Sequence, residues 1–126
     1  MDILISNNTD QPIYEQIREQ IKLQIINGVL KEGDALPSMR LLAKDLRISI
    51  ITTKRAYEEL EREGFIESYT GRGSFVKSVN RNVVREKIAS EIGELFEKAV
   101  EKAMAAEISC EEMQEMLKLY YDSGSS

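Results

Sequence analysis

The 126-residue sequence has no histidine and no tryptophan, and it contains a single cysteine, Cys110. The absence of histidine removes the commonest general base, the commonest metal ligand and the usual switch for pH changes near neutrality. Carboxylates could still bind Mg²⁺ or Ca²⁺, but no loop of the D-x-D-x-D-G type is present. Because no catalytic apparatus is visible, we expect a protein that is not an enzyme and that carries no metal or cofactor.

Long hydrophobic runs are also missing. No apolar stretch approaches the roughly 20 residues that a membrane-spanning helix needs, and residues 1–5 lack the basic flank of a signal peptide. Cys110 has no partner for an internal disulfide, and its neighbours are Glu111 and Glu112 instead of the cationic groups that activate a thiol. We therefore expect a cytoplasmic protein with no membrane partner.

The net charge of −5 is distributed unevenly along the chain. Residues 1–81 carry 12 basic and 12 acidic side chains, whereas residues 82–126 carry 5 and 10. Within residues 38–55, five Lys or Arg side chains accompany a single acid, Asp45, which gives a local charge of +4. Because the local potential decides where phosphate binds, this basic segment bears on nucleic-acid binding more than the acidic total does.

An apolar residue at every fourth position predicts a first helix, with Pro12 tolerated in its first turn. The apolar residues of this stripe are Ile13, Ile17, Ile21 and Ile25. Asp10 is the expected N-cap, and Gly28 is the expected end. Residues 1–9 are expected to form an irregular arm, and residues 29–37 a turn-rich connection.

Two further helices with a very short connection are predicted next. Ser38 and Ser49 can each cap a helix N-terminus, residues 47–48 form the turn between the two helices, and Gly64 ends the second of them. The buried face of this third helix is expected to consist of Thr53, Ala56, Tyr57 and Leu60. Two short helices joined by so tight a turn are typical of a helix-turn-helix.

The apolar period then changes from that of a helix to that of a strand. Residues 65–69 and 74–77 are rich in β-forming side chains, and residues 70–73 between them contain two glycines that can adopt positive φ. A two-stranded hairpin is marginal alone and must pack on the preceding helices. The sequence therefore predicts a mainly α fold with a small β-wing, a winged helix-turn-helix domain over residues 1–78.

Three motifs of this domain resemble those of the GntR family of bacterial transcription regulators. Residues 33–43, GDALPSMRLLA, resemble the family's G-x-x-LPS-x-R-x-LA signature. Residues 48–64 resemble its recognition-helix segment, and residues 71–76, GRGSFV, resemble its G-x-G-[TS]-[FY]-V wing. The motifs follow in the family's order and spacing over about residues 10–77. Residues 12–17 and the short helical tail resemble the YtrA subfamily in particular.

The resemblance implies sequence-specific binding to double-stranded DNA through the front of the third helix. The first turn of a recognition helix lies in the major groove, where hydroxyl groups, a lysine and unpaired N–H groups can contact bases or phosphates. Arg40 is implied to contact the backbone or a base, and Arg72 at the wing tip is expected to reach the minor groove. The candidate DNA-binding residues are Ser38, Arg40, Ser49, Ile50, Ile51, Thr52, Lys54, Gly71, Arg72 and Gly73.

Several of these positions have a second interpretation. Ile50 and Ile51 stand where a polar residue or an arginine is usual in the family; isoleucine can contact the thymine methyl group, but at least one of the two could instead pack against the wing or the first helix. Arg40 could be a surface ion-pair partner, and Ser49 a simple cap. Thr53 replaces the usual aliphatic residue, so its hydroxyl is expected to be hydrogen-bonded or partly exposed.

The residues after the wing predict a two-helix arm over residues 79–122. A polar hinge at residues 78–82 precedes a long amphipathic helix that ends near Ala106. Ser109 and Glu112 form a capping box for a final helix, and residues 123–126 are expected to be a disordered tail.

We expect this arm to mediate dimerisation, because two amphipathic stripes in so short a segment can be buried only against each other, the first domain or a second chain. Packing within one chain is the alternative to a twofold dimer. The candidate dimerisation residues are Ile88, Ile92, Leu95, Phe96, Ala99, Met113, Met116, Leu117 and Tyr120.

Together these features predict a dimeric transcription regulator, more specifically a repressor, whose two recognition helices read a palindromic operator. The arm is too short to enclose a drug-sized pocket by itself. A small-molecule effector could bind at the dimer interface near Phe96, Met116 and Tyr120, although such stripes are more often plain core. The competing interpretation is a winged helix that binds a protein partner without sequence-specific DNA binding.

Overall fold

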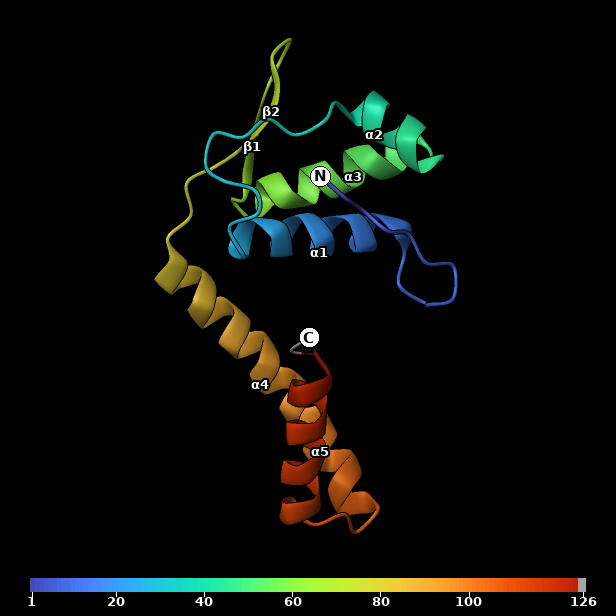
Figure 1. The fold of residues 1–126 in the computed structure, drawn as a ribbon, viewed down its shortest axis with the longest axis vertical. Helices are drawn as coiled ribbons and strands as arrows, with labels where there is room; N and C mark the ends of the chain where they lie inside the picture. The colour runs from blue at the N-terminus through green and yellow to red at the C-terminus, as the bar shows by residue number, and fades with distance from the viewer. Residues whose placement is uncertain (125–126) are drawn as a thin grey trace. The chain divides into compact units, whose positions relative to one another are not determined.

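The structure, a computed structural model, describes residues 1–124 and divides the chain into two compact units. The first unit spans Met1–Val84, and the second begins at Arg85. No helix within residues 1–124 is long and apolar enough to cross a membrane. Along the chain (Figure 1), the helices and strands are α1 (Ile13–Ile26), α2 (Met39–Leu46), α3 (Ile50–Arg62), β1 (Ile66–Tyr69), β2 (Gly73–Val76), α4 (Arg81–Ala105) and α5 (Cys110–Gly124).

The first unit is a winged helix-turn-helix, as the sequence predicts. α1 and α2 both pack on α3, and the centre of the core contains Ile17, Ile21 and Leu60, none of which has any exposed surface. At the edge of this core, Arg18 and Lys22 of α1 lie 3.3 and 3.7 Å from the Glu63 carboxylate at the end of α3. These contacts fix the position of α3 relative to α1.

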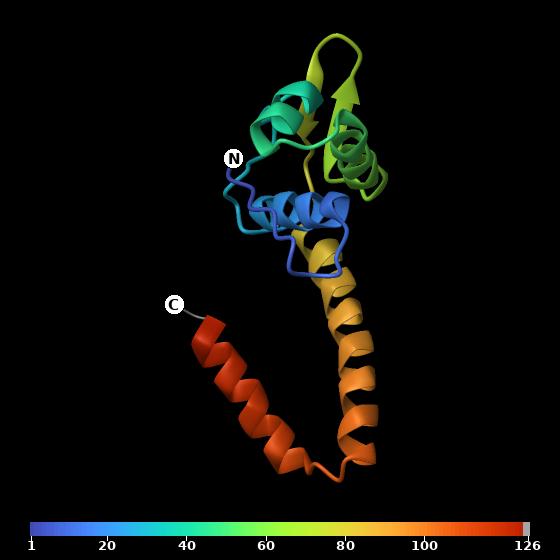
Figure 2. The ribbon, with the colours of Figure 1, turned by 90° about the vertical axis from the view of Figure 1, so that its right-hand side faces the viewer.

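The wing is tied to the helices by a third extended segment that the sequence analysis did not predict. β1 and β2 pair antiparallel, with Ile66 opposite Val76. On the other edge of β2, the Leu36 N–H donates to the Ser74 carbonyl at 2.9 Å, and the Val76 N–H donates to the Asp34 carbonyl at the same distance. Part of the expected turn-rich connection, residues 29–37, is therefore extended. Its backbone pairs with N–H and carbonyl groups of β2 that a lone hairpin would leave without a partner. Figure 2 shows the two strands of this hairpin next to each other, joined by the loop at the tip.

The N-terminal arm is held against α1 by glutamine side chains four residues apart. The Gln16 amide accepts from the Ser6 N–H at 2.8 Å and donates to the Ser6 carbonyl at 2.9 Å. Gln20 bonds the Leu4 peptide in the same two-way manner, and Gln24 donates to the Asp2 carbonyl. Four residues of a helix rise about 6 Å, and two residues of an extended segment span about 6.6 Å. Glutamines spaced four apart on α1 therefore face peptides spaced two apart in the arm.

Three predicted boundaries differ from the structure. Asp10 is not the cap of α1, because the N-cap is Pro12, whose carbonyl accepts from the Glu15 and Gln16 N–H groups at 3.1 Å. The expected hinge at residues 78–82 is shorter, since the Asn80 side chain accepts from the Asn82 N–H at 3.0 Å and starts α4 at Arg81. The final helix continues to Gly124, so residues 123–124 of the expected tail are helical; residues 125–126 lie outside the described residues.

The buried phenol of Tyr57 joins α3 to the start of α2. Its ring is 1% exposed, and its hydroxyl donates to the Pro37 carbonyl at 2.7 Å, directly before the cap of α2. Burial raises the pKa of Tyr57 above its ordinary value. The hydrogen bond thus holds the two helices of the helix-turn-helix in their relative position.

We predict that Tyr57→Phe lowers the free energy of unfolding at neutral pH by about 1–3 kcal/mol, because it leaves the Pro37 carbonyl without its partner. The raised pKa also means that the stability contributed by the neutral phenol is complete below about pH 10 and is lost as the pH rises further, since the unfolded chain ionises first. Urea unfolding of both proteins on either side of pH 10 measures both effects. Equal stability at neutral pH would contradict this role.

Candidate nucleic-acid interface

The buried face of α3 determines which of its side chains point outward. Thr53, Ala56, Tyr57 and Leu60 are all at most 1% exposed, which confirms the predicted face. The Thr53 hydroxyl donates to the Ser49 carbonyl at 3.5 Å, so this buried polar group is satisfied, as expected. At 100° per residue, the side opposite this face carries Ile51, Arg55 and Glu58, while Ile50 and Lys54 lie on one flank of it.

Both serine caps predicted for the helix-turn-helix are present. The Ser38 hydroxyl accepts from the Leu41 N–H at 3.1 Å, and the Ser49 hydroxyl accepts from the Thr52 N–H at 3.2 Å. Ser49 also lies 3.4 Å from the Thr52 hydroxyl. The serine oxygens are therefore used within the helix ends, while the Ser38 proton and the remaining N–H groups of each first turn are available to an acceptor such as phosphate.

The two isoleucines at the start of α3 are exposed to solvent. Ile50 is 45% exposed and Ile51 is 79% exposed. Ile51 therefore does not pack against the wing or α1, so the packing alternative is wrong for this residue. An apolar pair at the front of a helix, next to basic side chains, forms a surface that favours a partner with both charge and apolar groups.

The cations of residues 38–55 have different surroundings. Arg40 and Lys44 lie four residues apart on the exposed side of α2. Lys54 lies 3.9 Å from Glu58 in an exposed pair of little energetic value, so it can exchange that partner for a phosphate. Arg55 stacks over the Tyr14 ring at 3.8 Å, which ties its charge to α1.

The wing tip presents an exposed arginine between two glycines. Gly71 and Gly73 adopt φ values of +79° and +100°, which side chains with a Cβ rarely adopt. The Arg72 N–H closes the turn by donating to the Tyr69 carbonyl at 3.0 Å. Next to it, the Tyr69 hydroxyl donates to Glu67, and this hydrogen bond raises the pKa of Tyr69.

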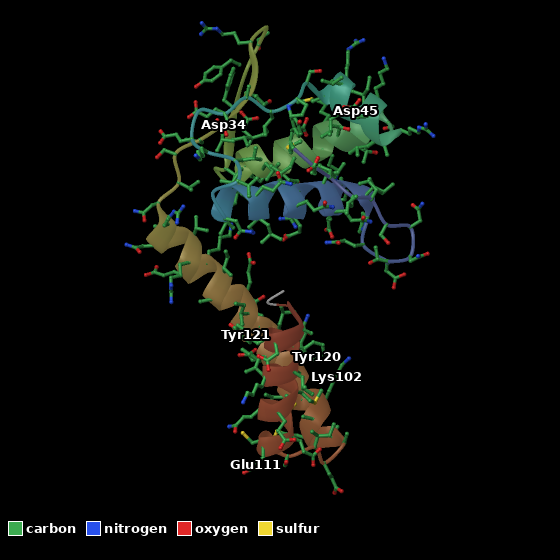
Figure 3. The ribbon with its side chains drawn as sticks, viewed as in Figure 1. Asp34, Asp45, Lys102, Glu111, Tyr120 and Tyr121 are labelled. Atoms are coloured by element: carbon green, nitrogen blue, oxygen red, sulfur yellow. The ribbon has the colours of Figure 1, made fainter. Side chains whose placement is uncertain are left out.

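In the second unit, almost all apolar side chains are exposed. Among its described residues, only Ala103 is buried, at 5%. Six of the nine candidate dimerisation residues are more than two-fifths exposed: Ile92, Leu95, Phe96, Met116, Leu117 and Tyr120. Figure 2 shows α4 and α5 diverging from their turn, and in Figure 3 Tyr120 and Tyr121 are seen on α5.

Several exposed residues of both units were not among the predicted contacts. Lys44 was counted as a charge but not proposed as a contact, although its spacing of four from Arg40 on a helix was visible in the sequence. Met104, Leu119 and Tyr121 are 75%, 68% and 73% exposed and extend the apolar surface of the second unit. Within residues 1–124, no group of three or more carboxylate or thiol side chains is arranged to hold a metal ion.

The three helices, the β-wing and the basic, partly apolar front of α3 define a winged-helix DNA-binding regulator. The family described as "Bacterial regulatory proteins, gntR family" matches residues 13–76. The chain is 36% identical to the HTH-type transcriptional repressor YtrA of Bacillus subtilis (strain 168) over 92% of this chain and 89% of the relative. The chain belongs to the GntR family, as its motifs indicate, and is of the YtrA type.

Two solved structures agree with this assignment. YtrA from Sulfolobus acidocaldarius, a GntR-family transcription factor, is 41% identical, and the match covers 72% of this chain and 97% of that chain with a TM-score of 0.59. AraR(DBD) in complex with operator ORX1 is 25% identical, over 60% of this chain and 95% of that chain, with a TM-score of 0.54. The winged helix of the first unit is thus similar to one that was solved on operator DNA.

Proposed function

We propose that this protein is a dimeric repressor that binds a palindromic operator through the first turn of α3, the start of α2 and the wing tip. It acts by binding, not by catalysis, and in the cytoplasm. The observation that carries the proposal is the exposed front of α3, where Ile50 and Ile51 stand beside Lys54. The names of its relatives, a transcriptional repressor and an operator complex, support the same function.

Within this interface, the side chains divide into two roles. Arg40, Lys44 and Arg72 would contact phosphates or, for Arg72, the minor groove, and these contacts set the register of the protein on the duplex. Ile50 and Ile51 would contact base edges in the major groove. The remaining candidate contacts are Ser38, Ser49, Thr52, Lys54 and the wing-tip glycines Gly71 and Gly73.

Dimerisation through the second unit would supply the second recognition helix. A large aliphatic or aromatic side chain that moves fully from water into an interface contributes about 1.5–3 kcal/mol, and the six exposed candidates of each chain would contribute part of this toward offsetting the cost of association. Two helices related by a dyad would read half-sites about 34 Å apart. An effector site lined by Phe96, Met116 and Tyr120 of two chains remains part of this proposal.

The proposal is tested by selecting duplexes from a random pool and measuring the affinity of the selected sequence at increasing salt. We expect a palindromic selected site and a steep fall in affinity with salt, because bound phosphates release counterions. Binding without sequence preference, or a partner protein bound with little dependence on salt, would favour the protein-interaction alternative.

We predict that Arg40→Ala weakens binding to the selected operator by about 1–3 kcal/mol, because one phosphate or base contact is lost. Arg62→Ala is the matched control, since Arg62 pairs with Glu59 at the far end of α3 and is not part of the proposed interface. Fluorescence anisotropy measures both affinities. If the two variants bind equally well, Arg40 does not contact DNA.

We further predict that Leu95→Glu shifts the protein from dimer to monomer and lowers operator affinity at least tenfold, because a carboxylate would be buried in the shared core. Leu95 is 67% exposed in the single chain, so the substitution leaves the monomer intact. Ser90→Glu adds the same charge on another side of α4 and should remain dimeric. Analytical ultracentrifugation distinguishes the outcomes, and a Leu95→Glu dimer would refute the interface.

A further inference from the structure

The most exposed side chain of the α3 front is an isoleucine, in the position where a recognition helix meets base edges. Ile51 is 79% exposed, and Ile50 beside it is 45% exposed. Isoleucine offers no hydrogen-bond donor or acceptor, so it cannot pair with the N7, O6, O4 or N4 atoms that distinguish most base edges. The two side chains can recognise only an apolar group.

The surroundings of the isoleucines favour duplex DNA as the partner. Arg40 and Lys44 extend from the exposed side of α2, and Lys54 lies one turn further along α3. This arrangement combines a small apolar surface with a local excess of positive charge, and a DNA groove combines phosphates with base edges in the same way. A protein partner with an apolar patch would not require the flanking cations.

In the major groove, the apolar group that a normal base pair presents is the C5-methyl group of thymine. 5-Methylcytosine carries a methyl group on the same ring carbon and presents it to the same groove. We propose that Ile50 and Ile51 read C5-methyl groups of pyrimidines, so that the operator of this protein contains thymines at these positions and binding responds to cytosine methylation there. This inference rests on the proposed function, since it requires that α3 enters the major groove.

The size of the effect follows from the burial of a single methyl group, which changes affinity about fourfold. The methyl contribution can be isolated because deoxyuridine differs from thymine only in this group.

The experiment starts from the duplex selected in vitro and changes one C5 substituent at a time. Each thymine of the half-site is replaced by deoxyuridine, and separately by cytosine or 5-methylcytosine with guanine opposite. We expect deoxyuridine to weaken binding about fourfold at one or two positions, and 5-methylcytosine to bind about fourfold more tightly than cytosine at those positions.

Protein variants identify the side chains responsible. Ile51→Ala and Ile50→Ala should each abolish the thymine–deoxyuridine difference at one position. Val29→Ala is the matched control, because Val29 is 67% exposed in the connection after α1 and should keep the full difference. All three substitutions affect exposed side chains, so the fold is retained.

The outcomes separate the inference from the proposed function. If the operator is bound but deoxyuridine has no effect at any position, the methyl inference is wrong and the DNA-binding function stands. If deoxyuridine weakens the binding of the Ile50→Ala and Ile51→Ala variants as much as that of the unsubstituted protein, the effect arises from DNA shape and the inference is also wrong. If no duplex is selected, the proposed function fails and the inference fails with it.

Discussion

The burial of one face of α3 is the constraint on which the proposed activity depends. Thr53, Ala56, Tyr57 and Leu60 occupy the centre of the first unit, so the opposite face must project into solvent. The Tyr57 hydroxyl also holds the start of α2 against the middle of α3 through the Pro37 carbonyl. The proposed DNA-binding surface is therefore a consequence of core packing, because its side chains are exposed where their neighbours in the helix are buried.

Two kinds of surface result from this chain. The front of the first unit is basic with a small apolar centre, whereas the second unit is acidic and exposes long apolar stripes. Each surface suits a different partner, because phosphates attract cations and apolar stripes are stabilised only by burial against similar surfaces. The net charge of −5 conceals this division, since it sums two regions of different charge.

Much of the fold was predictable from local signals. The serine caps, the turn at Arg47, the glycine stop at Gly64 and the change from helical to strand period each depend on neighbouring residues, and the structure confirms them. The features that were missed depend on long-range pairing: the extended segment along β2, and the glutamine side chains of α1 that hold the N-terminal arm. Glutamine on an exposed helix is common, so nothing in the sequence marks Gln20 as the partner of a peptide sixteen residues away.

The candidate contacts could be named from the sequence, but their accessibility could not. The sequence left open whether Ile51 packs inward, and only the three-dimensional position of α3 decides this. The most direct measurement of the central claim is an NMR titration of the full chain with the selected operator. The account predicts that the largest amide shifts occur at Ser49–Lys54, at the start of α2 and at Arg72. Shifts confined to α1 or to α5, with the front of α3 unchanged, would contradict it.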